Sequence, residues 1–140
     1  MAITATPYGQ SFIGLGMGRF DFTSHSFKVL LTTASYTPNF ASDTYRSDVT
    51  NEVSGVGYVT GGQALANLSW TYDDGVAILG CDPVVWTNAT FTARYAVIYR
   101  NTGTNTTSPL LSWVDFGVNV SPDNTDLPLN FINGVYRIRS

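Results

Sequence analysis

The sequence predicts an all-β protein with a single domain, either a jelly-roll-like β-sandwich or a barrel, preceded by an extended N-terminal arm. Three observations lead to this prediction. Val, Ile, Thr, Tyr, Phe and Trp, which favour strands, make up 56 of the 140 residues. Glu, Lys, Gln and Met, which lose little side-chain freedom in a helix, number only six. About seven or eight alternating segments are separated by turn signals, as is typical of sandwiches and barrels.

The chain has the length of one domain. We expect residues 1–26 to form the arm and residues 27–140 to form the β-sandwich domain. Gly9, Gly14, Gly16 and Gly18 interrupt any periodicity in the arm, so it is predicted to be irregular apart from a short strand near Phe20–Phe22.

The first regular strand is predicted at Phe27–Thr32, where the sequence reads FKVLLT. The following segment, Ser35–Gly62, shows no sustained alternation. We expect it to be irregular, with a helical turn within Ser47–Val53, because Ser47 can cap the turn and Asp48 suits its N-terminal end. Irregular segments of this length are uncommon unless they are functional or disordered.

Regular patterns resume after residue 63. Asp73-Asp74-Gly75 predicts a turn that joins Ala64–Tyr72 to Val76–Gly80 as a hairpin. Strands are also predicted at Thr90–Arg100 and Pro109–Phe116. The alternation within the hairpin and Thr90–Arg100 predicts a shared core of five side chains: Leu68, Trp70, Phe91, Tyr95 and Val97.

Asn133-Gly134 is the strongest short signal for a hairpin turn in the sequence. It lies between the apolar segments Leu127–Ile132 and Val135–Arg139. We therefore expect these two segments to pair with each other as the last hairpin of the chain.

Charge and targeting patterns exclude several classes of function. Charged residues make up 12% of the chain, the formal net charge is −3, and Lys28 is the only lysine. Such a surface does not suit nucleic acid, which requires a basic patch. We expect no signal peptide and no membrane span, because no apolar run is long enough. Low charge density also favours association with other subunits.

We expect no enzymatic activity, no cofactor and no metal site. The single histidine, His25, and the single cysteine, Cys81, are attributed to a surface loop and to the core. The acidic pairs Asp43/Asp48 and Asp73/Asp74 lack the spacing of a calcium loop. A glycosidase pair among the ten acidic residues stays open, although nothing singles one out.

The tryptophans could bind sugars if they were exposed on a β face. Trp70, Trp86 and Trp113 each lie in or beside an alternating segment. We therefore expect all three to pack in the core.

Four segments together resemble a family of small β-rich virion proteins of tailed bacteriophages, the head decoration or cement proteins. The segments are FKVLLTTASYTPN (27–39), SDVTNEVSGVGYVTGG (47–62), PVVWTNATFTARYAVIYRNTG (83–103) and SPLLSWVDFG (108–117). The resemblance covers about two-thirds of the chain, and the segments occur in the same order with similar spacing. The C-terminal segment NFINGVYRIRS departs from the alternating Thr/Ile/Trp strand of many relatives.

The resemblance implies a structural role without catalytic residues. It implies a protein made in the host cytoplasm and held on the capsid surface of the virion, where it binds the phage major capsid protein. We expect a homo-oligomer, a trimer or a dimer, that links neighbouring capsomers. Two alternatives stay open: a neck or tail structural protein, and a glycan-binding receptor module.

The arm is the candidate for assembly contacts. Its apolar side chains have no period that would pack them on their own domain, and its glycines let it follow an irregular surface. The alternative is that the arm folds back as an extra strand of its own sandwich. The candidate contact residues are Ile3, Tyr8, Phe12, Ile13, Phe20 and Phe22.

Overall fold

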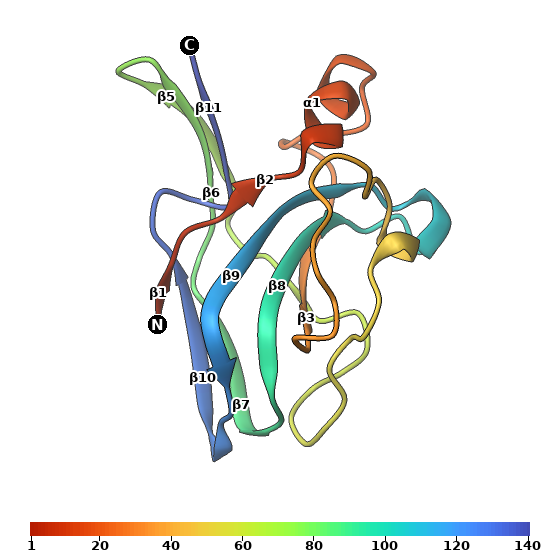
Figure 1. Ribbon diagram of the computed structural model, residues 1–140. Helices are drawn as coiled ribbons and strands as arrows, with labels where there is room; N and C mark the ends of the chain where they lie inside the picture. Colours follow the sequence, from red (N-terminus) through yellow and green to blue (C-terminus); the bar gives the residue numbers. More distant parts are fainter.

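The strands form a sandwich in the computed structural model, which describes residues 1–140 (Figure 1). One layer is a five-stranded sheet in the order β2 (Thr6–Pro7), β9 (Leu110–Val120), β8 (Ala93–Arg100), β3 (Phe27–Thr32) and β4 (Gln63–Ala64). The facing layer contains two three-stranded sheets. The first has the order β1 (Ala2–Ile3), β10 (Asp123–Phe131) and β7 (Val84–Thr90); the second has β11 (Tyr136–Arg139), β6 (Val76–Gly80) and β5 (Ser69–Asp73).

The predicted all-β sandwich is confirmed, and no sheet closes into a barrel. Helical structure is limited to α1 (Gly9–Gly16) and two 3₁₀ turns, η1 (Arg46–Asp48) and η2 (Asn105–Thr107). The turn η1 overlaps the predicted helical turn at Ser47 and Asp48, but it begins at Arg46, and Tyr45 rather than Ser47 is at its N-cap. The strand expected near Phe20–Phe22 is absent, because that stretch consists of turns and irregular backbone.

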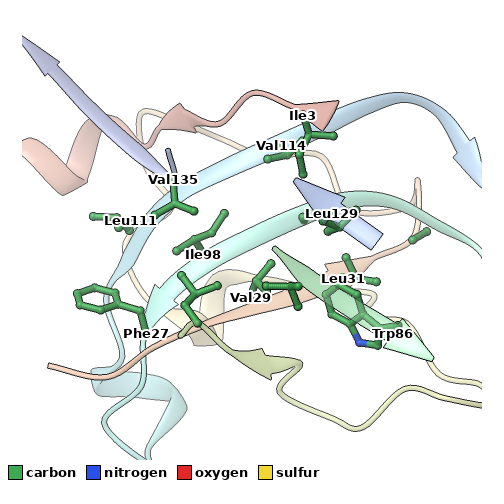
Figure 2. Close-up of a cluster of buried hydrophobic side chains, with 14 of the residues drawn as sticks. Ile3, Phe27, Val29, Leu31, Trp86, Ile98, Leu111, Val114, Leu129 and Val135 are labelled. Atoms are coloured by element: carbon green, nitrogen blue, oxygen red, sulfur yellow. The ribbon is translucent and has the colours of Figure 1, made fainter. Parts of the chain in front are cut away.

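The main core lies between the two layers (Figure 2). From the five-stranded sheet, β3 contributes Phe27, Val29 and Leu31, since alternate residues of a strand share one face. The largest side chain that meets them from the facing layer is Trp86 of β7, which is 1% exposed. Apolar side chains of β8, β9 and β10 fill the space between: Ala93, Ala96, Ile98, Leu111, Val114, Leu127 and Leu129.

A second, smaller core covers the opposite face of the five-stranded sheet. Leu30 of β3 and Val97 of β8 point to this face and are fully buried. Tyr36 and Val49, from the irregular segment Ser35–Gly62, pack on them. The long irregular segment therefore has a structural role, because it shields an apolar sheet face that water would otherwise reach.

The predicted shared face of Phe91, Tyr95 and Val97 is wrong. Phe91 lies in the main core, whereas Val97 is buried in the second core and Tyr95 packs against it. The pairing of β8 with β9 shifts register between Ala93 and Tyr95. Across this irregularity the partner on β9 steps from Val120 to Asp115, and the side chains of β8 that face the main core change from Ala93 to Ala96 and Ile98. Tyr95 and Val97 therefore lie on the opposite face.

The predicted C-terminal hairpin is also wrong, although its turn forms. Asn133 and Gly134 have φ values of 64° and 76°, as a two-residue turn with left-handed residues requires. A Cβ on Gly134 would lie 2.4 Å from the carbonyl oxygen of Leu79. The turn is thus packed against β6, and the chain leaves it to pair β11 with β6 rather than with β10.

The N-terminal arm belongs to the sandwich. β1 pairs in parallel with β10, and β2 pairs with β9. Four of the six candidate contact residues are buried in the domain: Ile3, Tyr8, Phe20 and Phe22. The expectation that they find no partners on their own domain is wrong. An irregular segment can bury apolar residues that are unevenly spaced along the sequence, so the absence of a regular period does not exclude packing on the domain. The structure corresponds to the alternative in which the arm folds back.

Removal of residues 1–25 is expected to unfold the protein. The truncation deletes four buried apolar side chains, and each large-to-small change in a core costs about 2–5 kcal/mol. Their sum reaches the whole stability of an ordinary domain, about 5–15 kcal/mol. Circular dichroism and thermal melting of the truncated chain test this expectation. The full chain with Met17→Ser, a change at a residue that is 65% exposed, serves as control and should melt like the wild type. A folded truncated domain would contradict this account of the arm.

Phe91→Ala is expected to lower the free energy of unfolding by about 3–5 kcal/mol, since it opens a cavity in the main core. The Phe91 ring is 7% exposed and lies edge-on to Tyr58, with ring centroids 5.8 Å apart. The matched control is Val118→Ala on β9, where the side chain is 63% exposed and the change should stay within about 0.5 kcal/mol. Urea unfolding measures both. Equal effects would show that Phe91 is not a core residue.

Candidate binding surface

Three exposed aromatic side chains lie on α1 and on β5, the outer strand of the sheet β11-β6-β5. Phe12 of α1 is 51% exposed, and Trp70 and Tyr72 of β5 are 38% and 68% exposed. We call these three residues the aromatic surface. Aromatic rings bury a large area when they are covered, so exposed ones are strong candidates for contact with a partner.

The β5–β6 hairpin holds two of these residues in place. Its predicted turn is confirmed: Asp74 and Gly75 have φ values of 49° and 80°, and Asp73 pairs with Val76. The strands pair without a register shift, so Trp70 and Tyr72 lie on the same face, two residues apart. The prediction that Trp70 packs in the core is wrong. Among aromatic rings only that of Phe22 packs against it, and the Trp70 side chain stays 38% exposed.

A chain of ring contacts joins the hairpin to the helix. Trp70 meets Phe22 edge-on, with ring centroids 4.7 Å apart. Phe22 in turn lies 5.8 Å from the ring of Tyr136, and Tyr136 lies 6.3 Å from that of Phe12. The buried rings therefore fix the exposed ones relative to each other. A surface that is already rigid loses little conformational entropy on binding.

The sequence does not predict the helix α1, because its glycines mask its pattern. Gly14 is buried, and a Cβ there would lie 2.9 Å from the ring of Phe20. The Ser11 hydroxyl donates to the carbonyl oxygen of Tyr8 and lies 2.8 Å from the Tyr136 hydroxyl. These small residues hold one side of the helix against the domain. The opposite side leaves Phe12 and Ile13 exposed.

The six predicted contact residues thus fall into two groups. Ile3, Tyr8, Phe20 and Phe22 are buried and are not accessible to a partner. Phe12 and Ile13, 51% and 55% exposed, are accessible on α1. Trp70 and Tyr72, which the hairpin adds to the aromatic surface, could have been identified from the alternating sequence pattern, since they share a face opposite polar residues.

One buried polar network fastens the irregular segment. The Arg46 guanidinium forms an ion pair with Glu52, and both side chains are largely shielded from water. Glu52 also accepts hydrogen bonds from the Tyr58 hydroxyl at 2.5 Å and from the backbone N–H of Gly61 at 2.7 Å. Every oxygen of this carboxylate has a donor, which is the condition for burying a charge at tolerable cost.

A second network joins the arm to the same segment. The Tyr8 and Tyr36 hydroxyls lie 2.8 Å apart, and Tyr36 donates to the Asp43 carboxylate at 2.7 Å. Burial raises the pKa of both phenols well above its ordinary value. Both hydroxyls are therefore kept as hydrogen-bond donors and acceptors. Neither reaches a cavity in which a substrate could lie.

The lone histidine and cysteine are not brought together with other reactive groups. His25 lies in a loop, where its Nδ1 accepts a hydrogen bond from the backbone N–H of Asp21 at 2.8 Å. Cys81 is partly buried against the main core, and burial raises the pKa of its thiol to about 11. A thiol with so high a pKa carries almost no thiolate at neutral pH and is a poor nucleophile.

The remaining candidates have structural surroundings. Trp86 is buried as predicted, and Trp113 is partly buried against the second core. Asp43 and Asp48 accept hydrogen bonds from backbone N–H groups of the irregular segment. No group of three or more His, Cys, Asp or Glu side chains has the arrangement of a metal site. The eight residues of α1 are too few to span a bilayer.

Comparisons of the chain with protein-family models, with curated proteins and with solved structures give no match. The functional assignment therefore depends on the sequence and on the aromatic surface.

The protein is expected to lose stability above about pH 10, the ordinary pKa of a tyrosine. Burial raises the pKa of five phenols in the folded state: Tyr8, Tyr36, Tyr58, Tyr99 and Tyr136. Their contribution to stability is complete below pH 10 and is lost as the pH rises toward the folded-state pKa, because the unfolded chain ionises first.

Urea unfolding at several alkaline pH values, with tyrosinate absorbance in parallel, measures this loss. Tyr58→Phe removes one of the five phenols and should make the decline with pH less steep, while lowering stability at neutral pH through loss of its hydrogen bonds. If all tyrosines of the folded protein ionised near pH 10, the burial of these phenols would be refuted.

Proposed function

We propose that this protein is a structural virion protein that decorates a phage capsid. It binds the outer surface of major capsid protein subunits and links neighbouring capsomers, after synthesis in the host cytoplasm. The sequence resemblance supports the class of partner, and the exposed aromatic surface supports the mode of binding. The aromatic surface is the observation that carries the proposal.

The resembling segments and the aromatic surface occupy different parts of the fold. Residues 27–39, 83–103 and 108–117 include β3, β8 and most of β9, the central strands of the five-stranded sheet, together with β7 of the facing layer. Residues 47–62 belong to the irregular segment over the five-stranded sheet. The aromatic surface lies on α1 and β5, outside all four segments. This division suits a decoration protein, in which a shared scaffold carries a binding surface adapted to one capsid.

Low charge also fits binding to a large neutral surface. The aromatic surface contains no charged side chain, so its burial removes apolar area from water at little desolvation cost. A single contact of this size gives only a modest binding affinity. An oligomer that touches several capsid subunits at once gains affinity through effective concentration, and its links then cross subunit boundaries.

A neck or tail position would use the same surface, and purified phage substructures distinguish it from a head position. A second candidate function is glycan binding. Trp70 and Tyr72 lie two residues apart on one face of a strand and are exposed, as are the aromatic side chains on which sugar rings stack. Binding to a glycan array and not to heads would favour this function.

The purified chain is expected to cosediment with phage heads that were assembled without it. The double variant Phe12→Ser, Tyr72→Ser should bind at least about tenfold more weakly, since truncation of central aromatic residues removes most of the energy of an interface. Both residues are more than half exposed, so the variant should melt like the wild type.

The control is Val118→Ser, an equally polar change at an exposed residue of β9 outside the aromatic surface. It should bind like the wild type. Absence of binding by the wild-type chain would refute the decoration proposal, and equal binding by all three proteins would place the contact elsewhere.

A further inference from the structure

Strand β5 has a free edge. It pairs with β6 on one side and with no strand on the other. In an antiparallel hairpin with a two-residue turn, the closing pair Asp73–Val76 exchanges hydrogen bonds, and the pairs then alternate along the strand. The backbone N–H and C=O groups of Trp70 and Tyr72 therefore point outward, away from β6.

The other sheet edges are short or protected. β1, β2 and β4 are two residues long, and β2 contains Pro7. β10 and β9 extend beyond their partners β1 and β2. In these stretches β10 contains Pro128 and register shifts, and β9 pairs irregularly with β8 between Asp115 and Val120. On β7 the Gln63 side chain donates to the carbonyl oxygen of Val85 at 2.8 Å, and Val56 forms a bridge with Thr90. β11 carries two arginines. Short strands, proline, covering groups and positive charge are the usual means of keeping sheet edges from pairing, and β5 has none of them.

We propose that two copies of this chain associate by antiparallel pairing of β5 with β5 about a two-fold axis at Thr71. The two sheets then join into one six-stranded sheet in the order β11-β6-β5-β5-β6-β11. The symmetric register aligns the outward backbone groups: Trp70 of each copy exchanges two hydrogen bonds with Tyr72 of the other. An interface of this kind is self-complementary, as a two-fold dimer requires.

The side chains of β5 fit this register. On one face, each Trp70 lies opposite a Tyr72 of the other copy, and such aromatic cross-strand pairs are favourable. On the other face the two Thr71 side chains meet at the axis, and Ser69 lies opposite Asp73. No like charges are brought together, because Asp73 is the only charged residue of the strand.

The strand that pairs with β5 is assigned to a second copy rather than to another protein, because the five residues of β5 are complementary to themselves in the antiparallel register. The contact area of two short strands is small, so the free protein is expected to associate at micromolar or higher concentration. Binding of several copies to one large particle would raise their local concentration and complete the pairing. The dimer also places the Trp70 and Tyr72 side chains of both copies on one continuous sheet face.

Substitutions at Thr71 test the pairing and its register. Thr71 is exposed, so Thr71→Lys and Thr71→Glu should melt like the wild type at low concentration. In the dimer, each would place two like charges opposite each other at the axis and should raise the dissociation constant about tenfold or more. An equimolar mixture of the two variants should recover dimers, because Lys then faces Glu. Thr71→Ser is the neutral control and should dimerise like the wild type.

Sedimentation velocity over a range of concentrations gives the result. A wild type that stays monomeric up to about 1 mM, a dissociation constant that would correspond to only about 4 kcal/mol, would overturn the proposal. So would dimers that Thr71→Lys and Thr71→Glu leave unchanged, because the contact would then lie elsewhere. The measurement uses the free chain without capsids, so its outcome is independent of the decoration proposal.

Discussion

The fold depends on burying both faces of the five-stranded sheet. Strands β3 and β8 carry apolar side chains on their two sides: Val29 and Ile98 face one way, Leu30 and Val97 the other. A two-layer sandwich covers only one face of such a sheet. The other face needs a cover, and here the irregular segment Ser35–Gly62 provides it. The arm contributes Ile3 to one side and Tyr8 to the other, which explains why so much of the chain outside regular strands is ordered.

This irregular cover explains the placement of the few charged groups. A segment that forms no ladder of strand hydrogen bonds must find other partners for its backbone N–H and C=O groups, and side-chain contacts must hold it in position. Arg46 and Glu52 supply them through their ion pair, and Tyr58 and Tyr99 extend the contacts to the backbone of Leu31 and Gly61. Buried ion pairs contribute little net stability, but removing one partner is costly. They therefore act mainly to select one arrangement of the segment.

Much of the fold could be predicted from local patterns, but the partners of each segment could not. The strand Phe27–Thr32 and the turn at Asp73-Asp74-Gly75 were predicted correctly, because alternation and turn chemistry act over a few residues. The irregular pairing after Ala93 leaves Val97 facing the second core, and the Asn133-Gly134 turn joins two different sheets. A bulge and the choice of a strand's neighbour depend on packing across the domain, which no local pattern encodes. For the same reason the sequence suggested six candidate contact residues in the arm but could not show that four of them face inward.

The exposed residues of the site follow from that packing. Phe22, from the arm, packs its ring edge-on against the ring of Trp70 and so supports the hairpin through a side chain on its face, not along its edge. The edge of β5 is left without a neighbour, in a chain whose single lysine, Lys28, lies on β3. Charged side chains are the commonest protection of such an edge, and low charge density removes that protection. The composition and the topology thus both point to β5: an open strand edge without lysine or arginine, with two exposed aromatic side chains and a sequence that can pair with a second copy.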